Sequence, residues 1–182
     1  SSSAASDVYK RQMLTRLYEQ DFDALYQIME QSFPTDEMRP YDAQKSLFKN
    51  NDFFAYGVKD ADGILTAFIT LWKMDGFTFG ENFAVDKSRR GSGLGSEIIS
   101  RAVEISKERF IFEVEPPETQ IAKRRIAFYE RAGFTLNDYD YTQPPLAKGQ
   151  NSLKLMIMST GGGLEKREFD DIKAQLYRKV YG

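Results

Sequence analysis

Hydrophobic residues along the chain switch between the spacing of strands and the spacing of helices. Residues 13–20 alternate and predict a first strand. The next segment opens at Asp21, a residue type suited to a helix N-cap, and then repeats apolar residues at helical spacing, at Phe22, Leu25, Ile28 and Met29. Residues 34–41 contain two prolines and several charges, which indicates a loop, and residues 42–50 predict a short second helix.

Three consecutive segments then have the composition of strands. Residues 52–60, 63–73 and 76–86 are rich in aromatic and β-branched side chains. Asp-Gly pairs separate them, and Asp-Gly is a strong signal for a hairpin turn. We expect these segments to form an antiparallel meander.

The second half of the chain predicts helices and strands in alternation. A helix is marked by Leu94, Ile98, Ala102 and Ile105, and Glu97 and Arg101 form an i,i+4 pair on its polar face. Two prolines end a strand over 109–117. A helix over 119–134 ends in Gly133, where a left-handed C′ residue lets Phe134 pack back on Tyr129. Two further strands, over 135–145 and 151–160, precede an amphipathic helix with Phe169, Ile172, Leu176 and Val180 on one face.

The order of these elements predicts an α+β fold. We expect a mixed, mostly antiparallel central sheet flanked by helices, with one parallel strand pair around the helix that follows the glycine-rich stretch. Residues 13–160 form one domain in this interpretation, and the helix within 161–182 packs on the same domain. Residues 1–12 lack strand or helix periodicity and resemble a translated adapter, so we interpret them as a non-native leader.

The amino-acid composition excludes several kinds of active site and several classes of partner. The 182 residues include no cysteine and no histidine, which excludes disulfides, thiolate nucleophiles, Cys/His metal sites and histidine-based triads. We therefore expect no metal. The net charge of −2 and the lack of a long basic stripe argue against nucleic acid as a partner. The longest apolar run, residues 64–72, is too short to span a bilayer as a helix, so we expect no membrane partner and a cytoplasmic protein.

The stretch DKSRRGSGLGSEI, residues 86–98, combines arginines with alternating glycines. A Walker loop is excluded because no lysine follows the glycines. A dinucleotide fingerprint accommodates Gly91 and Gly93 but requires a third glycine where Ser96 stands. A third pattern, Arg/Gln-x-x-Gly-x-Gly/Ala, matches Arg90, Gly93 and Gly95.

This third pattern has a physical rationale as a phosphate site. The amides at the start of a helix carry partial positive charge, and glycines let a pyrophosphate approach them. The candidate loop comprises Arg89, Arg90, Gly91, Ser92, Gly93, Leu94, Gly95 and Ser96. The alternative is a plain helix cap with solvated arginines, because short glycine motifs have many false positives.

A second motif, RRIAFYERAGF, places Phe128 and Tyr129 before a Gly-Phe helix end. With it, the chain from Met13 onward resembles the GCN5-related N-acetyltransferase (GNAT) superfamily, and small bacterial members in particular. The segments that carry this resemblance are Glu81–Val85, Val114–Pro117, Phe128–Phe134, Gln143–Leu146 and Val180–Gly182.

The resemblance implies direct attack of an amine on the thioester of acetyl-CoA, without a metal. The acceptor would be the primary amine of a small molecule, a peptide or a lysine. Tyr129 would be the general acid, since a phenol with an ordinary pKa near 10 carries its proton at neutral pH and can donate it; the alternative is a core residue at a helix end. Backbone groups of Phe83, Ala84 and Val85 would bind the pantetheine arm and stabilise the oxyanion.

The general base has two candidates. Glu81 shares the face of Phe79 and Phe83 on an otherwise apolar strand, and Glu113 lies mid-strand between Phe112 and Val114. A carboxyl group among apolar neighbours has a raised pKa that suits a base. Hydrogen-bonded structural glutamates, or a water chain as proton carrier, are the alternatives.

Acceptor-binding residues are expected in the 32–41 loop and the 140–146 turn, with Glu37, Tyr41, Tyr141 and Gln143 as candidates, although charged loops also serve solubility alone. Two positions depart from the family pattern: Asn82 stands where relatives often carry histidine, and Ala122 where many carry asparagine. They motivate a rival hypothesis, a non-catalytic acyl-CoA-binding or interaction module. As an assembly, a monomer or homodimer is expected.

Overall fold

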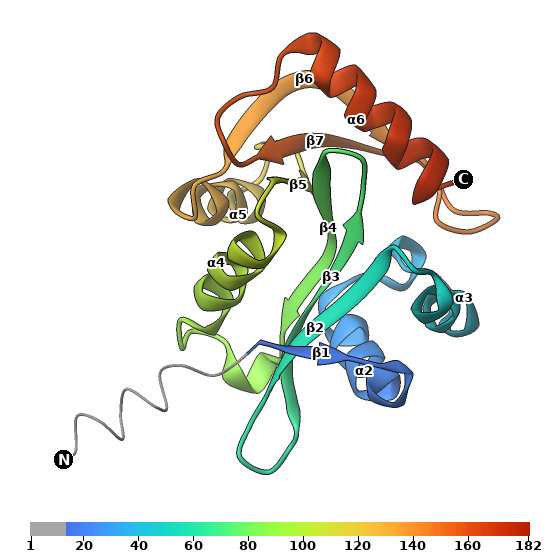
Figure 1. Ribbon diagram of the computed structural model, residues 1–182, viewed down its shortest axis with the longest axis vertical. Coiled ribbons are helices and arrows are strands. Elements are labelled where there is room, and N and C mark those ends of the chain that lie inside the picture. Colours follow the sequence, from blue (N-terminus) through green and yellow to red (C-terminus); the bar gives the residue numbers. More distant parts are fainter. Residues whose placement is uncertain (1–13) are drawn as a thin grey trace.

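The computed structural model describes residues 14–182; the expected leader at 1–12 lies outside the described residues. One seven-stranded sheet runs through the molecule in the order β1-β2-β3-β4-β5-β7-β6 (Figure 1). Its strands are β1 (Thr15–Leu17), β2 (Phe53–Lys59), β3 (Leu65–Lys73), β4 (Phe77–Val85), β5 (Arg109–Val114), β6 (Thr135–Gln143) and β7 (Leu153–Ser159).

Five α-helices connect and flank these strands in the described part of the chain. They are α2 (Phe22–Ser32), α3 (Tyr41–Ser46), α4 (Leu94–Ser106), α5 (Gln120–Arg131) and α6 (Lys166–Lys179). Single turns of 3-10 helix lie at Glu19–Asp21, Thr35–Glu37, Leu47–Lys49 and Lys87–Arg89. The order of strands and α-helices agrees with the order predicted from the sequence.

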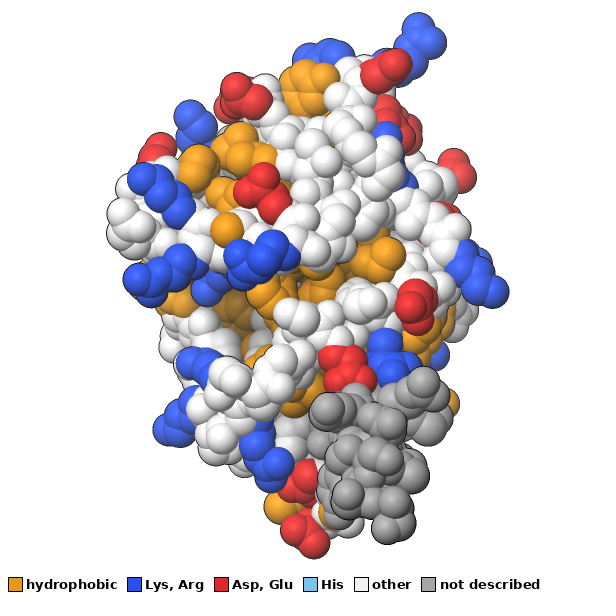
Figure 2. Space-filling model, turned by 90° about the vertical axis from the view of Figure 1, so that its left-hand side faces the viewer, with side chains coloured by type: hydrophobic (Ala, Val, Ile, Leu, Met, Phe, Trp, Pro, Cys, Tyr) orange, Lys and Arg blue, Asp and Glu red, His pale blue; other side chains and the backbone are white. Residues whose placement is uncertain are grey.

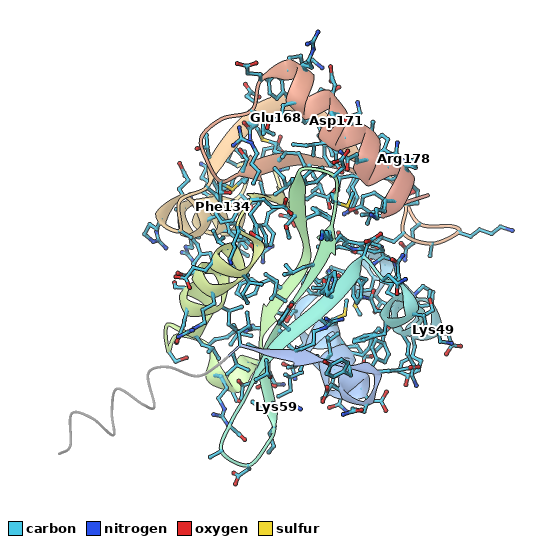
Figure 3. All side chains as sticks on the ribbon, in the orientation of Figure 1. Lys49, Lys59, Phe134, Glu168, Asp171 and Arg178 are labelled. Atoms are coloured by element: carbon cyan, nitrogen blue, oxygen red, sulfur yellow. The ribbon has the colours of Figure 1, made fainter. Side chains whose placement is uncertain are left out.

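The helices cover the sheet on two sides, and each side has its own core (Figure 1). Helices α2 and α6 pack their apolar residues, including Phe22 and Phe169, on one face. Helices α4 and α5 pack theirs, including Ile98 and Tyr129, on the other. Side chains fill both layers between helices and sheet (Figure 3). Within residues 14–182, no helix has the length and apolar character needed to cross a membrane.

All neighbouring strands pair antiparallel except β4 and β5, which are parallel. The predicted mixed sheet with one parallel pair around α4 is therefore confirmed. The Asp-Gly hairpins are also present, with Gly63 and Gly76 in the left-handed region at φ 79° and 84°. The end of α5 follows its prediction too: Gly133 has φ 96°, and the rings of Tyr129 and Phe134 lie 5.7 Å apart.

At the start of α2, Asp21 has the predicted position but its side chain makes other contacts. Asp21 occupies the N-cap position, but its carboxylate does not cap the helix. Its two oxygens accept hydrogen bonds from the Tyr18 amide and from Lys59 Nζ, each at 2.9 Å. A 3-10 turn over Glu19–Asp21 precedes the helix and turns the side chain away from the first free amides.

The parallel pair separates before either strand ends. Pairing joins Phe77–Gly80 of β4 to Arg109–Phe112 of β5 and stops there. Beyond Gly80, β4 continues to Val85 with β3 as its only neighbour in the sheet. The second half of β5 pairs with β7 instead, up to Val114. The two central strands therefore diverge and leave an opening in the middle of the sheet.

A β-bulge marks the point of separation. Leu71 of β3 pairs with Gly80 and Thr70 pairs with Asn82, so Glu81 is an extra residue in β4. The extra residue reverses the alternation of side chains: Phe79 belongs to the core under α2 and α6, whereas Phe83 packs against the core under α4 and α5. The expectation that Glu81 shares one face with Phe79 and Phe83 was wrong, because it assumed a regular strand.

Candidate active site

A pocket of about 670 Å³ occupies the opening between β4 and β5. On the side of the molecule that carries α4 and α5, Figure 2 shows hydrophobic side chains exposed within a hollow, with Lys and Arg side chains around it. Thirteen predicted site residues line the pocket: Glu81, Phe83, Ala84, Val85, Arg89, Arg90, Gly91, Gly93, Leu94, Gly95, Ser96, Glu113 and Tyr129. Ser92, Glu37, Tyr41, Tyr141 and Gln143 are not among its lining residues.

The glycine-rich loop forms one end of the pocket, where α4 begins at Leu94. Gly91 and Gly93 both have φ 82°, a conformation that side chains other than glycine rarely adopt. At Gly95 the constraint is space: a Cβ there would lie 3.3 Å from Phe83 Cζ, a tight contact, and 3.6 Å from Phe128 Cζ, an ordinary one. The glycines therefore shape the loop and keep the helix N-terminus accessible from the pocket.

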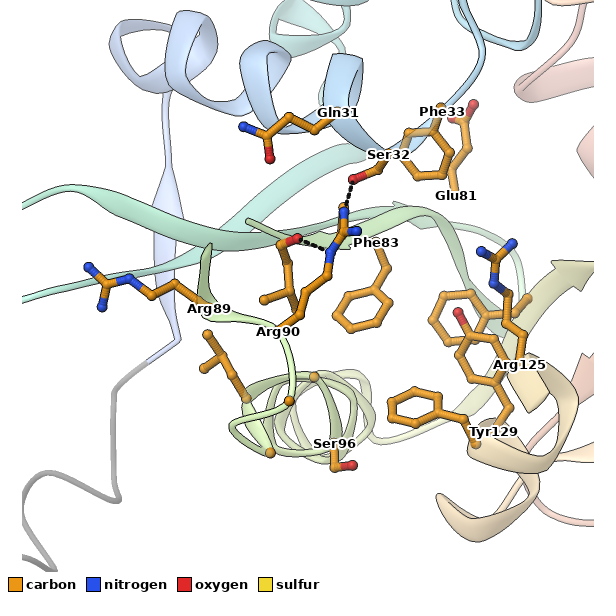
Figure 4. Close-up of a pocket in the computed structure, with 18 of the residues that line it drawn as sticks. Gln31, Ser32, Phe33, Glu81, Phe83, Arg89, Arg90, Ser96, Arg125 and Tyr129 are labelled. Atoms are coloured by element: carbon orange, nitrogen blue, oxygen red, sulfur yellow. Dashed lines mark hydrogen bonds between the residues drawn. The ribbon is translucent and has the colours of Figure 1, made fainter. Parts of the chain in front are cut away.

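The two arginines of the loop are held by neighbouring protein groups. Arg89 forms an ion pair with Asp60, with 2.7 Å between Nη2 and Oδ2. Arg90 donates from Nε to the Val85 carbonyl at 3.1 Å and from Nη2 to Ser32 Oγ at 3.3 Å (Figure 4). Arg90 therefore links the end of β4 to the end of α2, while Asp60 compensates the charge of Arg89.

Backbone groups of β4 point into the opening. The amides of Asn82 and Asp86 donate to Thr70 Oγ1 and to the Thr66 carbonyl, so both face β3. Because successive residues of a strand direct their backbone groups to opposite edges, those of Phe83 and Val85 face the pocket, and those of Ala84 face β3. The bond from Arg90 to the Val85 carbonyl agrees with this direction.

Tyr129 enters the pocket from α5. Its side chain is 7% exposed, and Figure 4 shows its hydroxyl directed toward the centre of the pocket, beside Arg125. Burial raises the pKa of Tyr129 to about 12, and the positive charge of Arg125 opposes this increase. The ring is fixed between Phe112, 4.8 Å away between centroids, and Phe134. The phenol is thus protonated at neutral pH and rigidly placed.

Glu81 enters the pocket from the bulge of β4 and is engaged on both oxygens. Its Oε2 lies 2.6 Å from Arg39 Nη1, and its Oε1 accepts from Trp72 Nε1 at 2.7 Å. The two charged side chains are 3% and 7% exposed. This buried ion pair holds the Glu81 side chain in place.

Glu113 enters from β5 and has only neutral hydrogen-bond donors. Its Oε1 accepts from Gln143 Nε2 at 3.0 Å and from the Tyr181 hydroxyl at 2.5 Å, and its Oε2 accepts from the Tyr141 hydroxyl. Burial, with a smaller contribution from the negative charge of Glu81, raises the pKa of Glu113, and the three hydrogen bonds oppose that increase. Among the described residues, Glu113 has no Lys or Arg within ion-pair distance.

The predicted acceptor residues do not meet in one place. Tyr141 and Gln143 contact Glu113 from β6, behind the pocket. Tyr41 lies on α3, where its hydroxyl bonds Asp23 and its ring packs on Phe22. Glu37 lies in the 3-10 turn before α3, where burial and the charge of Glu115 raise its pKa. Tyr141 lies within the predicted strand over 135–145, and this strand buries its side chain, so it is not exposed in an acceptor-binding turn.

Several lining residues were not among the predicted site residues. They are Gln31, Ser32 and Phe33 at the end of α2, Phe112 on β5, and Arg125 and Phe128 on α5. Of these, only Arg125 and Phe128 had a usable signal, because they lie one turn and one residue before Tyr129 on the helix. Asn82 and Ala122, the two departures from the family pattern, are both absent from the pocket lining. No cluster of acidic residues within the described range has the arrangement of a metal site.

Known proteins share both the sequence pattern and the fold. A protein of Bacillus subtilis (strain 168), "Putative acetyltransferase YjbC", is 24% identical over 160 residues, covering 86% of this chain and 80% of its own. A solved GNAT-family structure from Bacteroides thetaiotaomicron is 31% identical with a TM-score of 0.83, covering 93% of this chain and 98% of its own. A spermidine N-acetyltransferase SpeG chimera from Vibrio cholerae shares the fold at 15% identity and a TM-score of 0.64, covering 81% of this chain and 93% of its own.

The family assignment rests on a long continuous match. Residues 22–134, from the start of α2 to the residue after the C′ glycine of α5, match the Acetyltransferase (GNAT) family. This range contains the glycine-rich loop, the separated strands, and Tyr129. The chain therefore belongs to the GNAT family of acetyltransferases.

Proposed function

We propose that this acetyltransferase transfers the acetyl group of acetyl-CoA directly to a primary amine, on a small molecule or a peptide, in the pocket between β4 and β5. The observation that carries the proposal is the position of Tyr129 and Glu113. They belong to opposite faces of the sheet, yet both line the one pocket because the strands separate there. A phenol and a carboxylate thus face a single reaction centre.

The residues present suit the cosubstrate. The amides at the start of α4 would bind the pyrophosphate, with Gly95 leaving room for its approach. The pocket-facing backbone groups of Phe83 and Val85 would pair with the pantetheine arm as an added strand would. One of these N–H groups would also stabilise the negative charge that develops on the thioester oxygen. Arg90 must release the Val85 carbonyl if the arm pairs there.

Glu113 is the better of the two candidate bases. Glu81 is paired with the guanidinium of Arg39 at 2.6 Å, so its carboxylate already has a cationic partner. Glu113 has a raised pKa and no cationic partner among the described residues. An ammonium group in the pocket would supply the missing positive charge, and Glu113 would accept one of its protons before attack.

Tyr129 acts on the leaving sulfur. As the amine nitrogen bonds to the carbonyl carbon, the C–S bond breaks and the sulfur gains negative charge. A thiol has a pKa of roughly 8.5, so a phenol with a pKa of about 12 transfers its proton unfavourably to a free thiolate. The hydrogen bond that Tyr129 donates while the bond breaks is therefore its main contribution, and Arg125 assists by opposing the rise in pKa.

A screen of amines tests the proposal. The protein is incubated with acetyl-CoA and a library of polyamines, amino acids, aminoglycosides and lysine peptides, and thiol release is recorded with the mass of the acetylated product. We expect amine-dependent release with at least one class. Thermal stabilisation by acetyl-CoA without acetylation of any amine would instead favour the rival function, a non-catalytic acyl-CoA-binding module.

A further inference from the structure

The segment that follows α6 reaches both candidate carboxylates. The Val180 carbonyl accepts a hydrogen bond from Arg39 Nη2 at 3.3 Å, and Arg39 holds Glu81. The Tyr181 hydroxyl donates to Glu113 Oε1 at 2.5 Å. Val180 and Tyr181 are far in sequence from β4 and β5. Val180 contacts Arg39, the partner of Glu81, and Tyr181 contacts Glu113 itself.

Tyr181 is part of a closed set of hydrogen bonds. Gln143 Nε2 lies 3.0 Å from Glu113 Oε1 and 3.2 Å from the Tyr181 hydroxyl oxygen, so one amide group touches both ends of the Tyr181–Glu113 bond. Tyr141 donates to the second carboxylate oxygen. These donors engage both carboxylate oxygens and restrain rotation of the carboxylate, and none of the three donor residues is among the residues that line the pocket.

We propose that Tyr181 is a positioning residue for acetyl transfer, which fixes the Glu113 carboxylate toward the pocket and keeps it ready to accept a proton. This inference rests on the proposed function, in which Glu113 is the base. Tyr181 has no place among the pocket-lining residues, so it acts through Glu113 and not on the substrates.

The groups around Glu113 determine in which direction the loss of Tyr181 would shift the pKa of Glu113. The groups that face Glu113 are Glu81 on β4, Tyr141 and Gln143 on β6, and Tyr177 and Tyr181 from the α6 region. Arg125 and Tyr129 of α5 line the same pocket. Burial and Glu81 raise the pKa of Glu113, and each donated hydrogen bond lowers it. Burial also keeps Tyr181 protonated, since its pKa is raised well above 10. Loss of its hydroxyl therefore raises the pKa of Glu113 further.

The test compares Tyr181→Phe with Tyr177→Phe. Tyr177 lies on α6 and donates its hydroxyl to the Thr142 carbonyl, so its variant loses a similar bond without touching Glu113. In Tyr181→Phe we expect the acid limb of the kcat/KM profile to move up by about one pH unit, a tenfold loss at a pH on that limb. Acetyl-CoA affinity and the position of the limb in Tyr177→Phe should match the wild type.

A readout that needs no turnover separates this inference from the proposed function. The carboxyl carbon of Glu113, assigned by comparison with Glu113→Gln, is titrated by ¹³C NMR in wild type and Tyr181→Phe. We expect its midpoint to move to higher pH in the variant. If no amine is acetylated but the midpoint moves, the proposed function fails while the contact stands.

Two results would overturn the inference. One is an unchanged NMR midpoint in folded Tyr181→Phe; the other is an unchanged acid limb in a variant that is active. If Tyr181→Phe does not fold, Gln143→Met removes the amide that contacts both groups and should move the midpoint in the same direction. An unchanged midpoint in Gln143→Met would then count against the inference equally.

Discussion

Arg39 offers a direct test of how the buried ion pair contributes to stability. Its guanidinium forms the ion pair with Glu81 and also donates to Gln44 Oε1 and the Val180 carbonyl. Replacing Arg39 by methionine keeps much of the side-chain volume but leaves the Glu81 carboxylate buried, with Trp72 Nε1 as its remaining donor. Removing one partner of a buried ion pair costs about 3–5 kcal/mol, because the other charge is left uncompensated.

The loss should be visible in urea unfolding followed by tryptophan fluorescence. Trp72 is the chain's single tryptophan, is 1% exposed and donates to Glu81, so it reports on this cluster directly. A loss of 3–5 kcal/mol corresponds to a decrease in Tm of about 6–20 °C for a chain of this size.

Arg101→Met provides the matched control. Arg101 pairs with Glu97 at 3.4 Å on the surface of α4, where such a pair contributes about 0.3–0.5 kcal/mol. The double variant Arg39→Met/Glu81→Gln removes the uncompensated charge and keeps an acceptor for Trp72, so it should recover most of the loss. Equal losses in Arg39→Met and Arg101→Met, or no recovery in the double variant, would refute the reasoning.

The remaining predictions concern the pocket. Tyr129→Phe should lower kcat by about 100-fold while the Kd for acetyl-CoA is unchanged; turnover equal to that of the wild type would remove Tyr129 from the mechanism. Gly93→Val and Gly95→Val should each abolish acetyl-CoA binding measured by calorimetry, the first through its positive φ and the second through contact with Phe83. Gly76→Val, at a similar φ of 84° in a distant hairpin, should bind normally, and binding in both loop variants would exclude the phosphate-loop interpretation.

Short sequence patterns predicted those parts of the fold that depend on residues close together in the chain. The position of Gly133 after an apolar helix is sufficient to predict its left-handed conformation and the return of Phe134 onto Tyr129. The same holds for the Asp-Gly hairpins at Gly63 and Gly76. The spacing of the glycine-rich loop predicted a phosphate site, which stays a prediction, and its glycines do line the pocket at the start of α4.

The rest depended on contacts between distant segments. No residue type marks the bulge at Glu81, because the register shift arises from pairing with β3. Arg39 was a charge in a predicted loop, and only the packing of α2, α3 and α6 around it explains its burial. Likewise, Tyr141 on β6 and Tyr181 after α6 both contact Glu113, although both are far from it in the sequence. The sequence alone therefore could not decide whether Glu81 or Glu113 is the better candidate for the base.

The rate of acetyl transfer by Glu113→Gln tests the central claim most directly. Glutamine retains the shape of the side chain and one acceptor oxygen but cannot take a proton from the amine. At saturating acetyl-CoA and the pH optimum of the wild type, kcat should fall by about 100-fold or more, with an unchanged Kd for acetyl-CoA. A kcat within threefold of the wild type would contradict the account, because it would show that the proton leaves the amine by another route.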